Sequence, residues 1–193
     1  MKKLLKLITM LFLASAMVIS CGGGSGSDVP STSDCTETVS TLELSDGEWT
    51  VYMKQTSNFM DAEMELEATV TNGAYEFTSG KGSATVDLEK VFFEDFPEEA
   101  IEELKNMSDK EKNAMLEAMG DELPEGCDVS WDGLKLNIEA TASAEDLRDM
   151  EGMLDTEDMP DDAVIKTNAD KTKYTINFSL EDEDIEIIAV KNN

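Results

Sequence analysis

The residues of this chain that could do chemistry are carboxylates and thiols. The sequence contains 43 acidic residues, 15 basic residues, three cysteines and no histidine, which gives a formal charge of −28. Without histidine, the chain lacks the usual general base near neutral pH and the commonest metal ligand. Ser-His-Asp and Cys-His catalysis are therefore excluded.

Paired carboxylates can support general acid–base chemistry, such as glycoside hydrolysis, when two of them face each other across a cleft. In a chain this acidic, some pair satisfies such a spacing by chance, and no motif singles one out. We therefore expect no enzymatic activity and no cofactor. The acidic balance also excludes nucleic acid as a partner, because nucleic-acid binders present clustered Lys and Arg to phosphates.

An acidic loop over residues 155–162 is the candidate metal site. Ca²⁺ is a hard ion that takes carboxylate oxygens as ligands. The loop lacks the Asp-x-Asp-x-Asp-Gly spacing of an EF-hand, and a solvated loop that keeps the protein soluble is the alternative. The candidate ligands are Asp155, Glu157, Asp158, Asp161 and Asp162.

A second candidate site is apolar. Three phenylalanines lie within five residues, and methionines at helical spacing follow them. Such side chains could line a pocket for an apolar ligand between helices and a sheet, and a core corner between a strand and a helix is the alternative. The candidate residues are Phe92, Phe93, Phe96, Met115 and Met119.

The N-terminus predicts an export signal. Three lysines precede an almost wholly apolar run over residues 7–19, which is shorter than the ~20 residues that a membrane-spanning helix needs. The run ends with Val18 and Ile19, and Ser20 and Cys21 follow. This order of elements resembles the lipobox signal peptide of bacterial lipoproteins.

The resemblance implies a lipid anchor. In that family the signal peptide is cleaved before the cysteine, so Cys21 would carry diacylglycerol and acyl chains such as palmitate. The chain would then be anchored to the cell membrane or outer membrane and face the extracytoplasmic side. Two or three acyl chains hold a protein stably, whereas one binds marginally. An ordinary signal peptide or an uncleaved anchor is the alternative.

The remainder predicts a tether over residues 21–38 and one acidic domain over residues 39–193. Cys35 and Cys127 would lie in a compartment that permits disulfides. A bridge between them would close a loop of about 90 residues and stabilise the fold by ~4 kcal/mol in the chain-entropy model. Two unpaired thiols are the alternative.

Alternating apolar and polar residues predict strands, with Asn72-Gly73 as a hairpin turn. Glu63, Glu65 and Glu67 are expected to point outward from one of them. The predicted strands cover residues 48–55, 63–71, 74–78, 83–89, 128–142, 163–167, 173–180 and 184–190.

Helical spacing follows residue 95, where Ser108 and Glu111 form a capping box, and a short helix is expected to start at Ser143. We therefore expect an α+β fold, in which a mostly antiparallel, curved sheet of about seven or eight strands carries a helical insertion and a short second helix packed on one face. The order of elements over residues 60–190 resembles that of YehR-like small bacterial lipoproteins.

These observations predict a membrane-anchored extracytoplasmic lipoprotein whose domain is a non-catalytic binding module for a protein or envelope component. A carrier or sensor of an apolar small molecule is one alternative. A calcium-binding surface protein is the other.

Metabolic labelling tests the anchor. We expect labelled palmitate to enter the full chain and to be absent from the Cys21→Ser variant, because the thiol of Cys21 carries the lipid. The Cys35→Ser variant is the control and should keep the label. An unlabelled wild-type chain, or label that survives in C21S, would contradict the prediction.

Overall fold

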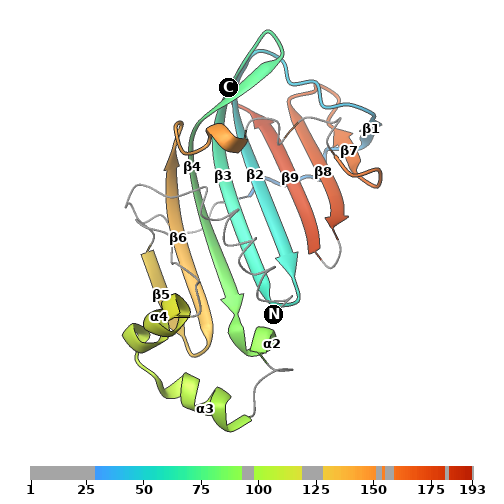
Figure 1. Cartoon of the computed structure of the whole chain (residues 1–193). Helices are drawn as coiled ribbons and strands as arrows, with labels where there is room; N and C mark the ends of the chain where they lie inside the picture. Colours follow the sequence, from blue (N-terminus) through green and yellow to red (C-terminus); the bar gives the residue numbers. More distant parts are fainter. Residues whose placement is uncertain are drawn as a thin grey trace.

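The chain folds into one β-sheet with short helices at one end of it, as the computed structural model shows (Figure 1). The structure describes residues 29–92, 98–118, 128–150, 154, 159–180 and 183–192. The strands are β1 (Glu37–Val39), β2 (Gly47–Ser57), β3 (Met60–Thr71), β4 (Ala74–Asp87), β5 (Asp128–Asp132), β6 (Lys135–Ser143), β7 (Val164–Thr167), β8 (Lys173–Leu180) and β9 (Glu183–Lys191). The helices are α2 (Leu88–Phe92), α3 (Glu98–Asn106), α4 (Asp109–Ala118) and the 3-10 turn η1 (Arg148–Met150).

The nine strands lie in the order β1-β7-β8-β9-β2-β3-β4-β6-β5, and every neighbouring pair is antiparallel. The longest strands, β2, β3 and β4, form a meander over residues 47–87. The predicted turn between β3 and β4 is confirmed. Asn72 and Gly73 have φ values of 54° and 81°, and a two-residue hairpin turn of type I′ needs positive φ at both positions.

The last strand, β9, joins the two halves of the open sheet by pairing with β2, the first long strand. β9 lies between β8 and β2, with Val51 opposite Ala189 and Met53 opposite Ile187. Because side chains alternate between faces, this register puts the apolar residues of β2, β3, β8 and β9 on one face, which we call the core face. Trp49 and Val51 are fully buried there.

A loop over residues 40–46 covers part of the core face. The indole nitrogen of Trp49 donates to the carbonyl oxygen of Ser45 at 2.8 Å, and the hydroxyl of Tyr174 donates to the carbonyl oxygen of Glu43 at 2.8 Å. The rings of Trp49 and Tyr174 lie 6.1 Å apart. Buried aromatic side chains with polar tips need such partners, so the two rings hold the loop against the sheet.

A second, smaller cluster lies where the helices meet the ends of β4 and β6. Ile101 and Leu104 of α3 pack there with residues of these strands. α4 is held by polar contacts. The ammonium of Lys112, a buried residue, donates to the carbonyl oxygen of Gly133 at 2.7 Å and lies 5.5 Å from the ring centre of Trp131. A desolvated cation over an indole face is an attractive arrangement.

The predicted α+β fold class is wrong, because the protein is predominantly β. The three described helices are short and sit at one end of the sheet, rather than forming a layer over one of its faces (Figure 1). Helical spacing correctly located α3 and α4, and the reciprocal bonds of the Ser108–Glu111 capping box are present, but α2 begins within the strand predicted over residues 83–89. Each helix contributes too few apolar residues to cover a nine-stranded sheet.

The short second helix expected at Ser143 does not form, which is a second error of the prediction. The backbone amide and hydroxyl of Ser143 donate to Asp146 at 2.8 and 2.6 Å, but turns follow, and only the 3-10 turn η1 is helical. The burial predicted for its apolar side chains is confirmed, because Leu147, Met150 and Leu154 all lie in the larger apolar cluster, on the core face. The capping interaction therefore starts a turn that delivers the same apolar side chains to the sheet.

Gly80 makes room for this packing. It lies opposite Leu66 on the core face, and a Cβ at this position would come within 2.6 Å of the Leu66 Cδ2 and 3.4 Å of the Leu147 Cδ1. Gly80→Val should therefore destabilise the fold by ~1–3 kcal/mol, because extra atoms force neighbours out of their preferred rotamers.

Urea denaturation of the two matched variants checks this prediction. Ser79→Val places the same side chain at the adjacent residue, which is exposed on the opposite face. This variant should change the free energy of unfolding by no more than ~0.5 kcal/mol. Equal unfolding midpoints for G80V and the wild-type chain would contradict the packing described here.

Candidate functional site

The face of the sheet opposite the core face is acidic. On β3, Asp61, Glu63, Glu65 and Glu67 alternate with core residues and so share this face. Consecutive same-face residues of a strand are ~6.6–6.8 Å apart, so the four carboxylates form a regularly spaced row. The outward orientation predicted from the sequence for the three glutamates is confirmed.

Cross-strand partners orient this row. The ammonium of Lys54 lies 3.5 Å from Glu63, and that of Lys81 lies 3.1 Å from Glu65. The Thr50 hydroxyl lies 3.2 Å from both oxygens of the Glu67 carboxylate and 3.0 Å from the Oδ1 of Asn192. Exposed ion pairs contribute at most ~1 kcal/mol each and leave most of the field of the surrounding acids unscreened.

Acids on neighbouring strands extend the row. Glu48 on β2 lies opposite Thr69, whose hydroxyl donates to it, and Asp184 and Glu186 on β9 lie opposite Thr56 and Lys54. We refer to this surface as the acidic face. On its central strands β2, β3 and β9 the carboxylates are Glu48, Asp61, Glu63, Glu65, Glu67, Asp184 and Glu186, and their cationic partners are Lys54 of β2 and Lys81 of β4.

The centre of the acidic face is closed to solvent. Ile188 lies opposite Tyr52 on one side and Thr175 on the other, and only 3% of its surface is exposed. Thr175 and Thr50 are also buried. Buried neighbours restrict the backbone beneath the charged side chains, so the strands form a rigid base for the carboxylates.

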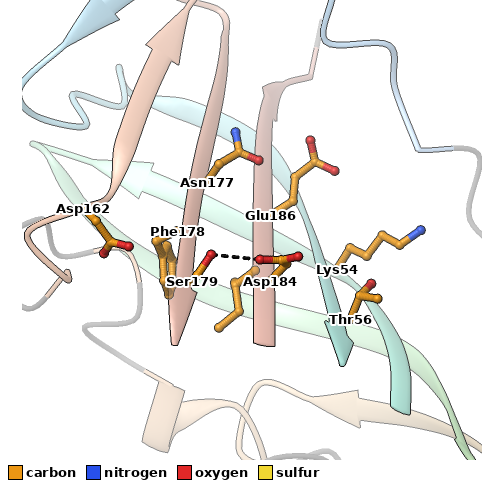
Figure 2. A pocket seen from close by; sticks show the side chains of 9 residues that line it. Lys54, Thr56, Asp162, Asn177, Phe178, Ser179, Asp184 and Glu186 are labelled. Carbon is orange, nitrogen blue, oxygen red and sulfur yellow. Dashed lines mark hydrogen bonds between the residues drawn. The ribbon is translucent and has the colours of Figure 1, made fainter. Parts of the chain in front are cut away.

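A groove of about 510 Å³ opens where β2, β8 and β9 approach their ends. Figure 2 shows its side chains, which come from these three strands and from the turn before β7. Its lining residues are Lys54, Thr56, Asp162, Asn177, Phe178, Ser179, Asp184, Ile185 and Glu186. Most of these side chains are polar or charged, and three of them are carboxylates.

One hydrogen bond orders the floor of the groove. The hydroxyl of Ser179 on β8 donates to the Oδ1 of Asp184 on β9 at 2.8 Å (Figure 2). Asn177 and Glu186 lie opposite each other on the same two strands and project to the same side (Figure 2). The only lysine of the groove, Lys54, already pairs with Glu63 of β3, so the local balance is acidic.

The structure does not test the predicted apolar site, which stays a prediction. Phe92 ends α2 and Met115 lies in α4, and nothing is described of their side chains. Phe93, Phe96 and Met119 lie outside the described residues. The groove that the structure describes is lined by other residues, most of which are polar or charged.

Of the five predicted metal ligands, two lie in the described part of the chain and three lie outside it. Asp161 and Asp162 are exposed in the turn before β7, and Asp162 lines the groove. Asp155, Glu157 and Asp158 lie outside the described residues. Within the described part of the chain, no three His, Cys, Asp or Glu side chains are grouped so that they could hold a metal ion.

Cys35 is a free, buried cysteine two residues before β1. Its thiol donates to the carbonyl oxygen of Lys173 at 3.8 Å, and the Lys173 ammonium pairs with Asp34 at 3.0 Å. Burial, together with the negative charge of Asp34, raises the pKa of the Cys35 thiol, whereas the hydrogen bond from Lys173 lowers the pKa of Asp34. The sheet begins at Glu37, so the end of the predicted tether belongs to the domain.

The strand order disfavours the predicted Cys35–Cys127 disulfide. β1 follows Cys35 at one edge of the sheet, and Asp128 begins β5 at the opposite edge. Bonded cysteines have Cα atoms closer than about 7 Å, and neighbouring strands are ~4.8 Å apart, so opposite edges of an open nine-stranded sheet are too far apart. Cys127 and the predicted anchor residue Cys21 lie outside the described residues, and both assignments stay predictions.

The groove was missed because it depends on strand order. The alternation of acids over residues 61–67 is visible in the sequence, but the adjacency of β9 and β2 is not, since nearly the whole domain separates them. The local signals were two acidic runs, one with Asp161 and Asp162 before the short strand β7 and one over residues 181–184 that ends in Asp184.

No family model matches the chain, and no curated protein and no solved structure matches it either. In the described part of the chain, no helix has the length and apolar character needed to cross a bilayer.

Alkylation of Cys35 tests its burial and its redox state. In the folded mature chain at pH 8.5, reaction with iodoacetamide should be at least ~tenfold slower than in urea, since a buried thiol with a raised pKa supplies little accessible thiolate. Mass spectrometry of the peptide that carries Cys35 gives both rates.

The same sample decides whether the thiol is bonded. We expect Cys35 to react completely once the chain is unfolded, without any reductant. Alkylation that requires prior reduction would overturn the free thiol and restore the disulfide prediction.

Proposed function

We propose that this chain is a lipid-anchored, extracytoplasmic and non-catalytic binding module that presents its acidic face to a cationic protein or envelope component. The observation that carries the proposal is the row of carboxylates on β3, continued by Asp184 and Glu186 of β9 on the same face of the sheet. Most apolar side chains of these strands pack on the core face, whereas Ile188 of β9 is buried on the acidic side. The carboxylates of the acidic face belong to neither apolar cluster, so their side chains are available for binding.

Charge and geometry both support a cationic partner. A surface lined by one sign of charge accelerates encounters with the opposite sign and repels the same sign. A flexible acidic tail would supply the charge alone, whereas these carboxylates are held at strand spacing over a buried centre. Fixed positions add specificity, because the partner's cations must match the spacing.

The anchor is compatible with this arrangement. The described chain begins at Val29, and Lys173 donates to the carbonyl oxygen of Ser31 at 2.9 Å, which ties the first described residues to the start of β8. Lys173 shares a face of β8 with Thr175, so residues 31–34 are attached on the acidic side of the sheet, at β8 rather than at β2 or β3. A lipid at Cys21 would place the domain near a membrane.

Site-specific photo-crosslinking in cells that make the full chain tests the proposal. A photoreactive residue at Ser83, which is exposed and lies opposite Glu63, should yield a covalent adduct with the partner. The yield should fall about tenfold in the Glu63→Gln/Glu65→Gln variant, since two charges worth ~0.7 kcal/mol each amount to a factor of ten.

The matched control removes the same charge elsewhere. Glu99 and Glu103 are exposed on α3, so Glu99→Gln/Glu103→Gln lowers the net charge equally without touching the acidic face. The adduct should persist in this variant. An adduct that is lost equally in both variants reflects total charge alone, and an adduct that neither variant weakens is independent of the acidic face. Either result would refute the proposal.

A further inference from the structure

Two neighbouring strands beside the groove differ in length. β8 pairs with β9 over its whole length, from Lys173 to Leu180. On its other side it pairs with β7 only as far as Asn177, which lies opposite Val164. Among the described residues, no strand continues β7 opposite the last three residues of β8. The chain before β7 turns away instead, with the amide of Ala163 donating to the carbonyl oxygen of Pro160 at 2.9 Å.

The backbone of Ser179 faces this gap. In an antiparallel sheet, the N–H and C=O of one residue point to the same side, and the side alternates along the strand. The backbone N–H and C=O of Lys173 point toward β7. The carbonyl oxygen accepts a hydrogen bond from the amide of Asn168, and the N–H donates to the Asn168 side chain. Ser179 lies six residues later, so its backbone N–H and C=O point to the same side, toward the place where β7 would continue.

Exposed apolar side chains flank the gap. Val164 and Leu180 are 43% and 45% exposed and are two of the three large hydrophobic residues that the described chain leaves this exposed. They lie at the two ends of the gap, on β7 and β8. A strand edge with unpaired polar groups and adjacent apolar side chains is a template for another extended segment.

The charge around the gap selects the occupant. Asp162, Asp184 and Glu186 line the adjoining groove, and Lys54 is already paired with Glu63. A second copy of this chain would bring a charge of −28 and the same carboxylates to the edge, and like charges oppose such pairing. A basic segment would instead place its lysine or arginine side chains among three acids.

We propose that the edge of β8 at Ser179 docks a short extended segment of the cationic partner by adding it as a strand in line with β7. The segment exchanges two main-chain hydrogen bonds with Ser179, lays an apolar side chain against Val164 or Leu180, and directs a basic side chain into the groove. This inference rests on the proposed function, because it takes the partner to be cationic, and it adds the place and the backbone conformation of the bound segment.

Amide hydrogen exchange of the mature chain in detergent micelles, followed by NMR, tests the docking site. The probe is the capped hexapeptide Thr-Lys-Val-Lys-Val-Thr. At saturation it should slow exchange of the Ser179 amide about tenfold, because the amide gains a hydrogen bond in place of water. The same peptide with its four central amides N-methylated keeps its charge but cannot pair as a strand, and it should give no protection.

Charge variants provide the second readout. Asp184→Asn/Glu186→Gln should weaken the peptide about tenfold, whereas the Glu99→Gln/Glu103→Gln control should bind it as the wild-type chain does. Protection of Ser179 that persists with the N-methylated peptide, or a Ser179 amide already protected in the free chain, would overturn the inference.

The outcomes separate the two proposals. Binding that perturbs the amides of β3 but leaves Ser179 unprotected would refute docking at the edge and leave the acidic face as the binding surface. No binding of the basic peptide at millimolar concentration would refute both. A peptide with glutamate in place of lysine that protects Ser179 equally would show that the edge does not select a cationic segment.

Discussion

Pairing between β2 and β9 holds the two halves of the sheet together. It joins the β2-β3-β4-β6-β5 half to the β1-β7-β8 strands through nine residue pairs, from Trp49 opposite Lys191 to Ser57 opposite Glu183. The ordering entropy of closing so long a chain must be offset by burial at this junction. Trp49 and Val51 supply it, because both are fully buried between strands that come from opposite ends of the sequence. Tyr174 and the loop over residues 40–46 then cover the junction.

The same register determines what the outer surface can do. With Val51 opposite Ala189, the acids of β9 and the acids of β3 lie on one face, and a slip by one residue would turn Asp184 and Glu186 into the core. The acidic face and the core are therefore two consequences of one pairing. The groove adds a third, since it forms where β8 and β9 extend beyond the short strand β7.

Local patterns predicted the features that depend on neighbours in sequence. Period-two alternation located most strands and the outward side of Glu63, and Asn72-Gly73 marked the central hairpin, because each is decided by a few consecutive residues. The predicted α+β fold class was wrong, because helical spacing indicates that a helix exists but not whether it covers the sheet. The turn at Ser143 satisfied a capping pattern without continuing as a helix. β1, the groove and the opposite-edge positions of Cys35 and Asp128 follow from strand order, which no local pattern encodes.

The central claim is that the β2–β9 pair makes one cooperative sheet that carries the acidic face. Amide hydrogen exchange across a urea series measures this directly, because amides that open only on global unfolding share its free energy and its denaturant dependence. The amides of Val51 on β2 and Ile187 on β9 should exchange together with the most protected amides of β3. Exchange of Ile187 by a lower-energy opening, while Val51 stays protected, would show that β9 detaches from a stable remainder and would contradict the account.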